Sequence, residues 1–325
     1  MAGILVIGET APDGSLARIS AEVATLARTL AEQGGTKAGG IVVAADTAGA
    51  AGAAEELARY LPRVRALDDA VLADHAAPQR VAVAVLDAAR EADHVLIGAS
   101  PDGRDVAGIL SAVLGRGVLV NAVGVDWQDG PIVEMSAFGG KLITRSRFAN
   151  GAGIVTVRPN VVTAEPAPEP GTVERATAAE AAKLPLVRVV DRVAEASAAA
   201  PIEEATVIVA GGRGMGSPDG FRIVEEIAEA LGGAVGASRA AVDSGWIPYS
   251  QQIGQTGKIV KPRLYLALGI SGAIQHKVGM QTAETIVAVN RDPDAPIAEF
   301  ADVVVVGDLF TIGPALMAEL RRRAG

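Results

Sequence analysis

Five short apolar runs in the last third of this chain each end in a polar or glycine-rich cluster. The clusters begin at Gly211, Ser238, Ser271, Asn290 and Gly307. Short β-branched apolar runs are typical of parallel strands buried on both faces. Ligands of open α/β sheets bind beyond the carboxyl ends of such strands. Five polar strand ends at one edge therefore predict an extended ligand, such as a large nucleotide cofactor.

The first cluster is a glycine-rich loop at residues 211–216 (GGRGMG), which follows an apolar run and precedes a helical pattern. A pyrophosphate loop has this position, but the G-x-G-x-x-G pattern is not met: in a motif that starts at Gly212, Ser217 replaces the last glycine. A tight turn that needs glycine is the alternative interpretation. Arg213 favours a ligand, because a guanidinium in such a loop usually meets an anion or a polar ring edge.

The second cluster resembles the nucleophile elbow of a serine hydrolase. Residues 236–240 (GASRA) place Ser238 at the elbow position, and Asp243 and His276 follow in the order of a hydrolase. Ala240, however, stands where the elbow needs its final glycine. A serine hydrolase is therefore kept as an alternative.

Residues 254–258 (GQTGK) resemble half of a phosphate-binding loop. The full pattern needs glycine at the position of Gln252 and Ser or Thr at the position of Ile259, so phosphoryl transfer is excluded. Gln255 and Thr256 remain as neutral hydrogen-bonding groups that suit a ring with both donors and acceptors.

The densest cluster is residues 269–276 (GISGAIQH). Ser271 is expected to cap a helix whose free N–H groups form an anion site, and His276 should lie just over one turn into that helix. A structural histidine is the alternative, although the neighbouring clusters favour a ligand. His75 and His94 have no companions at ligand spacing, so no metal site is expected.

Asn290 and Asp308 end the last two apolar runs. Each is a candidate turn or helix cap. Their matching position at the sheet edge favours contact with ribose or ribityl hydroxyls.

Composition narrows the function classes. Of the 325 residues, 50% are hydrophobic, the formal net charge is −9, and there is no cysteine. The acidic balance argues against a nucleic-acid partner, and the missing thiols exclude disulfides and cysteine-ligated metal sites. The mean hydropathy is +0.32, yet no uncharged apolar run reaches the ~18 residues that a membrane span needs. With no leader-like segment before the first apolar run, a cytoplasmic protein is expected.

The elements that position these clusters predict an α/β fold with two domains. Residues 1–200 should form an N-terminal α/β domain, and residues 205–325 a small doubly wound parallel sheet, with a linker near residues 191–204. The expected strands of the first half are 4–8, 41–45, 94–98 and 118–123, with helices near 16–32, 52–60, 79–91 and 105–114. Residues 132–138, 141–145 and 154–158 should be antiparallel strands, with a hairpin at Gly139 and Gly140. Residues 163–172 should be an exposed loop, and residues 186–190 are strand-like.

With its clusters in this order, the second domain resembles the FAD domain of the alpha subunit of electron-transfer flavoproteins. The matching segments start at residues 211 (GGRG), 234 (AVGASRAAVD), 254 (GQTGK), 269 (GISGAIQH), 279 (GM), 286 (IVAVN), 292 (DP), 295 (API) and 308 (DL). Arg291 stands where many members carry lysine, which keeps the charge. The first domain resembles the family's other α/β domain.

The resemblance implies a heterodimer of alpha and beta subunits with one FAD, held mostly by this alpha chain. It also implies AMP, or a second FAD in electron-bifurcating members, in the beta subunit. The cofactor-binding positions implied are Arg213, Ser238, Arg239, Ile253, Gly254, Gln255, Thr256, Ser271, Gly272, Ala273, Ile274, Gln275, His276, Asn290, Asp308 and Leu309.

The resemblance further implies an electron carrier rather than an enzyme, and no catalytic residue. The usual electron donors of this family are flavin dehydrogenases such as the acyl-CoA dehydrogenases of fatty acid β-oxidation, and the usual electron acceptor is a membrane quinone reductase. A self-sufficient FAD- or NAD-dependent oxidoreductase in the same crevice is the alternative, but it needs a proton-transfer residue, for which His276 is the candidate.

Three residues are expected to tune the bound flavin. Reduction places negative charge near N1 and O2 of the ring, so a fixed cation or donor at that edge raises the potential. The hypothesis assigns the permanent charge to Arg239, a hydrogen bond to O2 to His276, and a hydrogen bond to N5 to Thr256.

Overall fold

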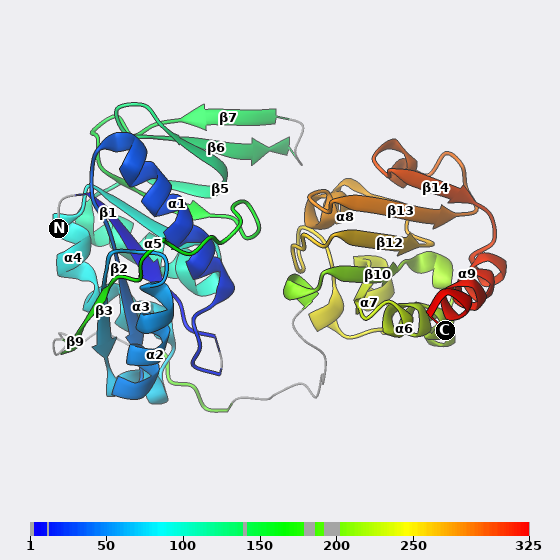
Figure 1. The fold of residues 1–325 in the computed structure, drawn as a ribbon, viewed down its shortest axis with the longest axis horizontal. Helices are drawn as coiled ribbons and strands as arrows, with labels where there is room; N and C mark the ends of the chain where they lie inside the picture. The colour runs from blue at the N-terminus through cyan, green and yellow to red at the C-terminus, as the bar shows by residue number, and fades with distance from the viewer. Residues whose placement is uncertain (1–2, 12, 139–141, 179–185, 192–201, 325) are drawn as a thin grey trace. The chain divides into compact units, whose positions relative to one another are not determined.

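The computed structural model describes residues 3–11, 13–138, 142–178, 186–191 and 202–324. The chain divides into two compact units, Met1–Val193 and Ala194–Gly325 (Figure 1). The junction predicted near residue 200 lies outside the described residues and stays a prediction. Among the described helices, none combines the length and apolar character that crossing a bilayer requires.

The first unit is built on a nine-stranded sheet in the order β7-β6-β5-β8-β4-β1-β2-β3-β9 (Figure 1). Only the β5–β6 and β6–β7 pairs of this sheet are antiparallel, and the other neighbours run parallel. The strands are β1 (Ile4–Gly8), β2 (Ala38–Ala44), β3 (Arg63–Asp68), β4 (His94–Gly98), β5 (Val118–Trp127), β6 (Pro131–Ala137), β7 (Leu142–Ser146), β8 (Gly153–Val157) and β9 (Thr172–Thr177).

Helices cover both faces of this sheet. One core joins the sheet to α1 (Arg18–Gly34) and α2 (Thr47–Leu57). The other core joins it to α3 (Ala77–Ala84), α4 (Leu86–Glu91) and α5 (Pro101–Leu114). Successive side chains of β1 enter opposite cores, which is why this strand is apolar without interruption.

The predicted α/β class is confirmed, but one pairing was wrong. Residues 154–158 were expected to be antiparallel, whereas β8 lies between β4 and β5 and runs parallel to both. Strands β3 and β9 were not predicted, and residues 186–190 contribute a single bridge, between Arg188 and His75, instead of a strand. The hairpin glycines at 139 and 140 lie outside the described residues.

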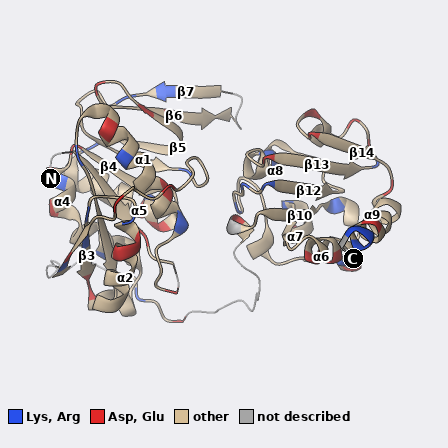
Figure 2. Cartoon of the chain, viewed as in Figure 1, with Lys and Arg blue, Asp and Glu red and all other residues tan. Residues whose placement is uncertain are grey.

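The second unit is a five-stranded, all-parallel sheet in the order β11-β10-β12-β13-β14. Its helices α6 (Arg222–Ala230), α7 (Arg239–Asp243) and α9 (Leu309–Ala324) pack on one face and α8 (Ile274–Met280) on the other (Figure 1). None of its five strands carries a charged residue (Figure 2). These strands are β10 (Val207–Gly211), β11 (Ala234–Ala237), β12 (Leu264–Leu268), β13 (Thr285–Asn290) and β14 (Val303–Val306).

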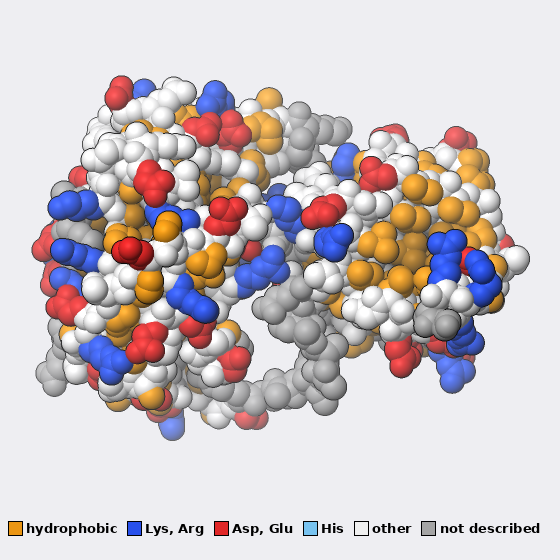
Figure 3. Space-filling model, in the orientation of Figure 1, with side chains coloured by type: hydrophobic (Ala, Val, Ile, Leu, Met, Phe, Trp, Pro, Cys, Tyr) orange, Lys and Arg blue, Asp and Glu red, His pale blue; other side chains and the backbone are white. Residues whose placement is uncertain are grey.

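The strand order of the second unit reverses at β10, since the chain goes from β10 to β11 on one side and then to β12 on the other. A ligand of a doubly wound sheet binds at this switch point, beyond the carboxyl ends of the strands. Apolar side chains also gather on the visible face of this unit, over β12 to β14 (Figure 3). Val303 and Val306 of the edge strand β14 are 49% and 55% exposed.

The first unit buries a carboxyl group at its own switch point, between β1 and β4. Glu9 follows β1 and accepts a hydrogen bond from the hydroxyl of Ser100, the residue that caps α5. Its other oxygen, Oε1, is buried without a hydrogen-bond partner among the described residues. Burial raises the pKa of Glu9 from 4.5 to about 7; the Ser100 hydrogen bond acts in the opposite direction, and the charge of Asp102 adds to the rise.

We expect Glu9→Gln to stabilise the first unit at alkaline pH. The folded protein binds the proton of Glu9 more tightly than the unfolded chain does, so the stability that this proton contributes is complete below pH 4.5 and is lost as the pH rises through about 7. The linked free energy is about 3 kcal/mol. Glutamine cannot ionise. At pH 8.5 the variant should therefore be more stable than the wild type by up to about 3 kcal/mol. At pH 5 the two proteins should have similar stability.

Urea unfolding followed by the fluorescence of Trp127 would measure this difference. A Trp246→Phe background removes the other of the two tryptophans. Glu32→Gln, at an exposed position of α1, is the control. Parallel pH profiles for the two variants would show that Glu9 ionises without cost.

Candidate functional site

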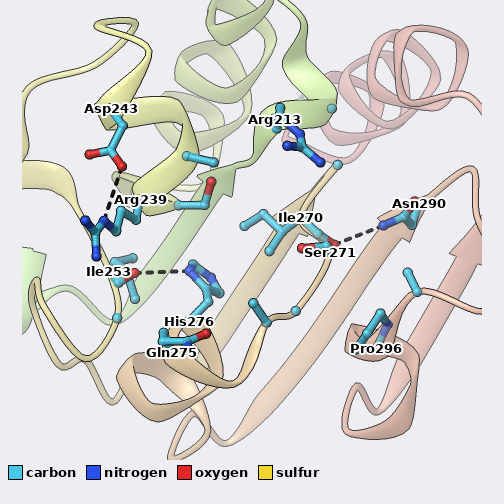
Figure 4. A pocket seen from close by; sticks show the side chains of 18 of the residues that line it. Arg213, Arg239, Asp243, Ile253, Ile270, Ser271, Gln275, His276, Asn290 and Pro296 are labelled. Carbon is cyan, nitrogen blue, oxygen red and sulfur yellow. Dashed lines mark hydrogen bonds and ion pairs between the residues drawn. The ribbon is translucent and has the colours of Figure 1, made fainter.

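A pocket of about 620 Å³ opens at the carboxyl edge of the second sheet (Figure 4). The segments that follow β10, β11, β12 and β13 all contribute to its wall. The lining residues are Arg213, Gly214, Ser238, Arg239, Ala240, Asp243, Ile253, Gly254, Gln255, Thr256, Gly269, Ile270, Ser271, Gly272, Ala273, Gln275, His276, Asn290, Arg291, Asp292, Ala295 and Pro296.

The pocket brings together most of the cofactor-binding positions expected from the sequence, but three of them do not line it: Ile274, Asp308 and Leu309. Asp308 accepts a hydrogen bond from the backbone N–H of Phe310 and so acts as the cap of α9, the alternative that its sequence position left open. Leu309 is buried in the core beneath α9. Ile274 is the first residue of α8 and is 44% exposed.

Close backbone contacts explain the glycines in the wall. The N–H of Gly214 donates to the carbonyl of Gly269 at 3.0 Å. A Cβ on Gly214 would lie 2.7 Å from the Cα of Gly269, and a Cβ on Gly212 would lie 2.3 Å from the Gly269 oxygen. The loop after β10 therefore packs directly on the turn after β12, and only glycine fits there.

Sequence reasoning placed a helix cap at Ser271, and this was wrong. Gly272 has a φ of +82°, so the chain turns there before the helix starts. Helix α8 begins at Ile274 after Ala273, and no side chain caps it. His276 consequently lies in the first turn of α8 rather than beyond it.

The arginines that line the pocket differ in whether they are paired with a carboxylate. Arg239 pairs with Asp243, Nε to Oδ2 at 3.2 Å, and both side chains are exposed (Figure 4). Within the described part of the chain, no ion pair or side-chain hydrogen bond involves Arg213 or Arg291. Both guanidinium groups are therefore available to an anionic ligand, while Arg239 must share its charge with a carboxylate.

The hydroxyl of Ser238 is a further polar group of the pocket wall. Its Oγ is buried and makes no hydrogen bond to any residue that the structure describes. Neither Asp243, which pairs with Arg239, nor His276, whose ring nitrogens bond elsewhere, is hydrogen-bonded to it. The hydrolase arrangement is thus not assembled, and a buried hydroxyl in a pocket wall points to a ligand that would satisfy it.

The loop that resembles a phosphate-binding loop has a different geometry. Lys258 is directed to Glu203, with Nζ to Oε1 at 2.7 Å. The buried amide of Gln252 donates to the hydroxyl oxygen of Thr256 at 3.1 Å, and Tyr249 donates to the Thr256 carbonyl. Because the Thr256 oxygen already accepts from Gln252, its own hydrogen remains for an acceptor elsewhere, as a bond to a ring nitrogen requires.

His276 is held from two sides. Its Nδ1 lies 3.1 Å from the carbonyl oxygen of Ile253 and its Nε2 lies 2.9 Å from the hydroxyl of Tyr265. Burial lowers the pKa of His276 to about 4, so the ring is neutral near pH 7. A hydrogen bond from His276 to a flavin O2 would require the ring to give up one of these two partners.

The amide of Asn290 fixes the turn that follows β12. Its Nδ2 donates to the carbonyl of Ile270 at 2.9 Å (Figure 4). Its Oδ1 accepts from the N–H of Asp292 at 3.0 Å. Asn290 thus joins the ends of two neighbouring strands while it lines the pocket.

Sequence reasoning missed several wall residues: Gly214, Ala240, Asp243, Gly269, Ile270, Arg291, Asp292, Ala295 and Pro296. Most of them lie within the matching segments, next to positions that were chosen. For Arg291 and Asp292 the sequence did offer a signal, because both directly follow Asn290, which was chosen as a strand-end residue. The pairing of Asp243 with Arg239 also had a signal, since an acid four residues from an arginine on a helix is a neighbour of it.

Comparison with known proteins places both units. The family model described as an electron transfer flavoprotein domain matches residues 4–185, and the one described as an electron transfer flavoprotein FAD-binding domain matches residues 201–281. Two relatives named electron transfer flavoprotein subunit alpha, from Mycobacterium leprae and Mycobacterium tuberculosis, are 43% identical over 343 and 340 residues, with all of both chains covered. A relative of the same name from Thermoanaerobacterium thermosaccharolyticum is 37% identical over 322 residues, 95% of each chain.

Proposed function

Since the chain belongs to the family of electron transfer flavoprotein alpha subunits, we propose that it binds FAD in the pocket of its second unit and passes electrons between protein partners. Bound FAD supplies the redox chemistry, because it accepts electrons from a donor and releases them to an acceptor. The chain supplies binding groups, orientation and the electrostatic environment.

One observation carries the assignment of the site. Most of the pocket wall, from Arg213 to His276, falls within the region that matches the FAD-binding domain, and the wall exposes polar groups that lack partners among the described residues. Arg213 and Arg291 suit the pyrophosphate of a dinucleotide, and the orphaned hydroxyl of Ser238 suits a ring or sugar oxygen. These donors fit FAD, and the pocket volume of about 620 Å³ is in the range of cofactor sites.

We assign the remaining contacts as follows. Thr256 donates its free hydrogen to N5 of the ring, and Arg239 places a positive charge beside it. The backbone turns at Gly254 and Gly272 allow the cofactor a close approach. Of the positions expected from the sequence, we retain those that line the pocket, and give Asp308 and Leu309 the role of forming the start of α9.

The partners belong to the same proposal. A beta subunit that carries AMP or a second FAD completes a heterodimer in the cytoplasm. Flavin dehydrogenases, such as the acyl-CoA dehydrogenases of fatty acid oxidation, donate electrons, and a quinone reductase or another protein accepts them. We propose that the alpha chain converts no substrate by itself; in support, His276, the candidate for proton transfer, is bonded to other residues at both ring nitrogens.

Coexpression with the candidate beta subunit tests this function. The purified complex should be yellow, contain one FAD per alpha chain in addition to any flavin bound by the beta subunit, and accept electrons from a reduced flavin dehydrogenase. A colourless complex that stays empty after incubation with FAD would contradict the proposal, as would turnover of a substrate by the complex alone.

We expect Arg239→Ala to lower the midpoint potential of the bound FAD. A fixed positive charge stabilises the reduced flavin more than the oxidised one, so its removal favours oxidation. A loss of about 1.4 kcal/mol corresponds to about 30 mV for a two-electron couple, and an exposed arginine that shares its charge with Asp243 should give an effect of this order. The measurement is a spectroscopic redox titration of the complex.

The control is Arg263→Ala in the same unit. Arg263 is an exposed arginine that also pairs with a carboxylate, Glu284, but does not line the pocket. If both variants shift the potential equally, or neither does, Arg239 is not the charge beside the ring.

A further inference from the structure

A carboxylate lines the pocket that is proposed for an anionic cofactor. Asp243 is the last residue of α7 and contributes to the pocket wall. FAD carries a negatively charged pyrophosphate, and reduction adds negative charge to its ring. A carboxylate in the same wall repels both charges. Asp243 should therefore oppose the binding and the reduction of the cofactor, so its presence in the wall calls for an explanation.

The partner of this carboxylate is Arg239. Arg239 begins α7 and Asp243 ends it, so the four-residue spacing places both side chains on one face of the helix. Nε of Arg239 lies 3.2 Å from Oδ2 of Asp243, and Figure 4 shows the two side chains directed toward each other. Among the described residues, neither side chain has another hydrogen-bond or ion-pair partner.

The ion pair engages the guanidinium at one nitrogen. The hydrogen bond to Asp243 uses Nε, so within the described part of the chain both terminal NH₂ groups of Arg239 remain without a partner. A guanidinium has five N–H donors in a planar fork, and four of them are thus left for a ligand. Asp243 can hold Arg239 in the wall without taking up the hydrogen bonds that a flavin would use.

Folding stability does not account for this pair. The side chains of Arg239 and Asp243 are 64% and 61% exposed, and an exposed ion pair contributes little to stability because water screens it. The carboxyl end of a helix is also where the helix dipole disfavours a negative charge, and Asp243 lies at that end of α7. What the carboxylate changes most is the charge that Arg239 presents to the pocket.

A second carboxylate of the wall lacks this pairing. Asp292 lines the pocket and accepts a hydrogen bond from the N–H of Asp294 at 3.0 Å, as a turn-forming aspartate does. No ion pair involves it among the residues that the structure describes. Asp292 therefore brings the same charge to the same wall without contacting Arg239, which makes it a matched control for the ion pair.

We propose that Asp243 is a positioning residue that sets how much of the Arg239 charge acts on the bound flavin. It holds the guanidinium by Nε and competes for it with the reduced ring, because both are negatively charged. The midpoint potential of the FAD is therefore lower with the ion pair than it would be with an unpaired Arg239. This role rests on the flavin-binding function proposed above.

The first test is Asp243→Asn in the FAD-loaded two-chain complex, because asparagine keeps the shape of the side chain and removes its charge. We expect the midpoint potential to rise, in the direction opposite to the shift expected for Arg239→Ala. A spectroscopic redox titration measures the shift. Asp292→Asn, the control, should shift the potential less. A potential that is unchanged or lowered in Asp243→Asn, or an equal rise in both variants, would overturn the proposal.

Asp243→Glu tests whether a carboxylate restores the effect. Glutamate is one methylene longer and can still reach the guanidinium, so we expect a potential closer to the wild type than to Asp243→Asn. A glutamate variant that shifts the potential as far as Asp243→Asn does would overturn the proposal, because the charge of the partner would then not matter.

A double-mutant cycle separates an effect through Arg239 from a direct effect on the ring. If Asp243 acts through Arg239, the rise caused by Asp243→Asn should be much smaller in an Arg239→Gln background. An equal rise in both backgrounds would show that the carboxylate acts on the flavin directly, and would contradict the proposal. A wild-type complex that holds no FAD would instead refute the proposed function, so the two failures are distinguishable.

Discussion

Replacing Arg213 by glutamate should weaken FAD binding by on the order of 100-fold or more while the second unit stays folded. Arg213 is exposed, lines the pocket, and has no hydrogen-bond or ion-pair partner among the described residues, so its loss breaks no internal contact. A hydrogen bond to a charged group contributes about 1.5–3 kcal/mol, and the reversed charge adds repulsion against a pyrophosphate. Each 1.4 kcal/mol is a factor of about ten in affinity.

Titration of the deflavinated complex with FAD, followed by flavin fluorescence, would give the dissociation constants. Arg213→Lys keeps the charge but loses the planar fork, and we expect it to bind FAD with intermediate affinity. Arg263→Glu, at an exposed arginine outside the pocket, controls for the change in net charge. If Arg213→Glu and Arg263→Glu bind FAD equally, Arg213 does not contact the cofactor.

Strands buried on both faces were the part of the fold that the sequence predicted best. β1 and β4, which are buried along their whole length, have the predicted bounds, because each is a short apolar run that ends at glycine. β3 was missed because its arginines alternate with apolar residues, and β9 because it is an exposed strand at the edge of the sheet. Local composition gives the bounds of a strand best where burial on both faces leaves an uninterrupted apolar run.

The partner of a strand was harder to predict than the strand. β8 was recognised, but its pairing was wrong because its sequence was grouped with the two antiparallel strands predicted at residues 132–138 and 141–145. All five of its residues are buried, as is typical of a central parallel strand.

In the candidate site, too, one part was predictable from the sequence and another was not. The cluster at each strand end was predictable, since the topology brings parallel strand ends to one edge. The contacts of His276 were not, because Tyr265 and Ile253 are 11 and 23 residues away in the sequence and come from other elements. The helix cap assigned to Ser271 failed because the positive φ of Gly272 places a turn between the serine and α8.

That turn leads to the second large effect, a loss of stability in Gly272→Ala. The φ of Gly272 is +82°, and a Cβ there would lie 2.4 Å from the backbone nitrogen of Ile297, which donates to the Ser271 carbonyl at 3.0 Å. The left-handed conformation costs a non-glycine residue about 1–2 kcal/mol, and moving two backbone segments apart costs more. We expect a total of about 3–5 kcal/mol.

Gly216→Ala separates these two costs, because Gly216 has a φ of +74° but open space where a Cβ would lie. We expect this control to lose only the conformational cost of about 1–2 kcal/mol. Urea unfolding followed by the fluorescence of Trp246, which packs against the core of the second unit, would measure both variants in a Trp127→Phe background. Equal losses would show that Ile297 yields to the new methyl group at no cost. A larger loss in Gly272→Ala, together with weaker FAD binding, would show that the contact between Gly272 and Ile297 holds Ser271 in the pocket wall.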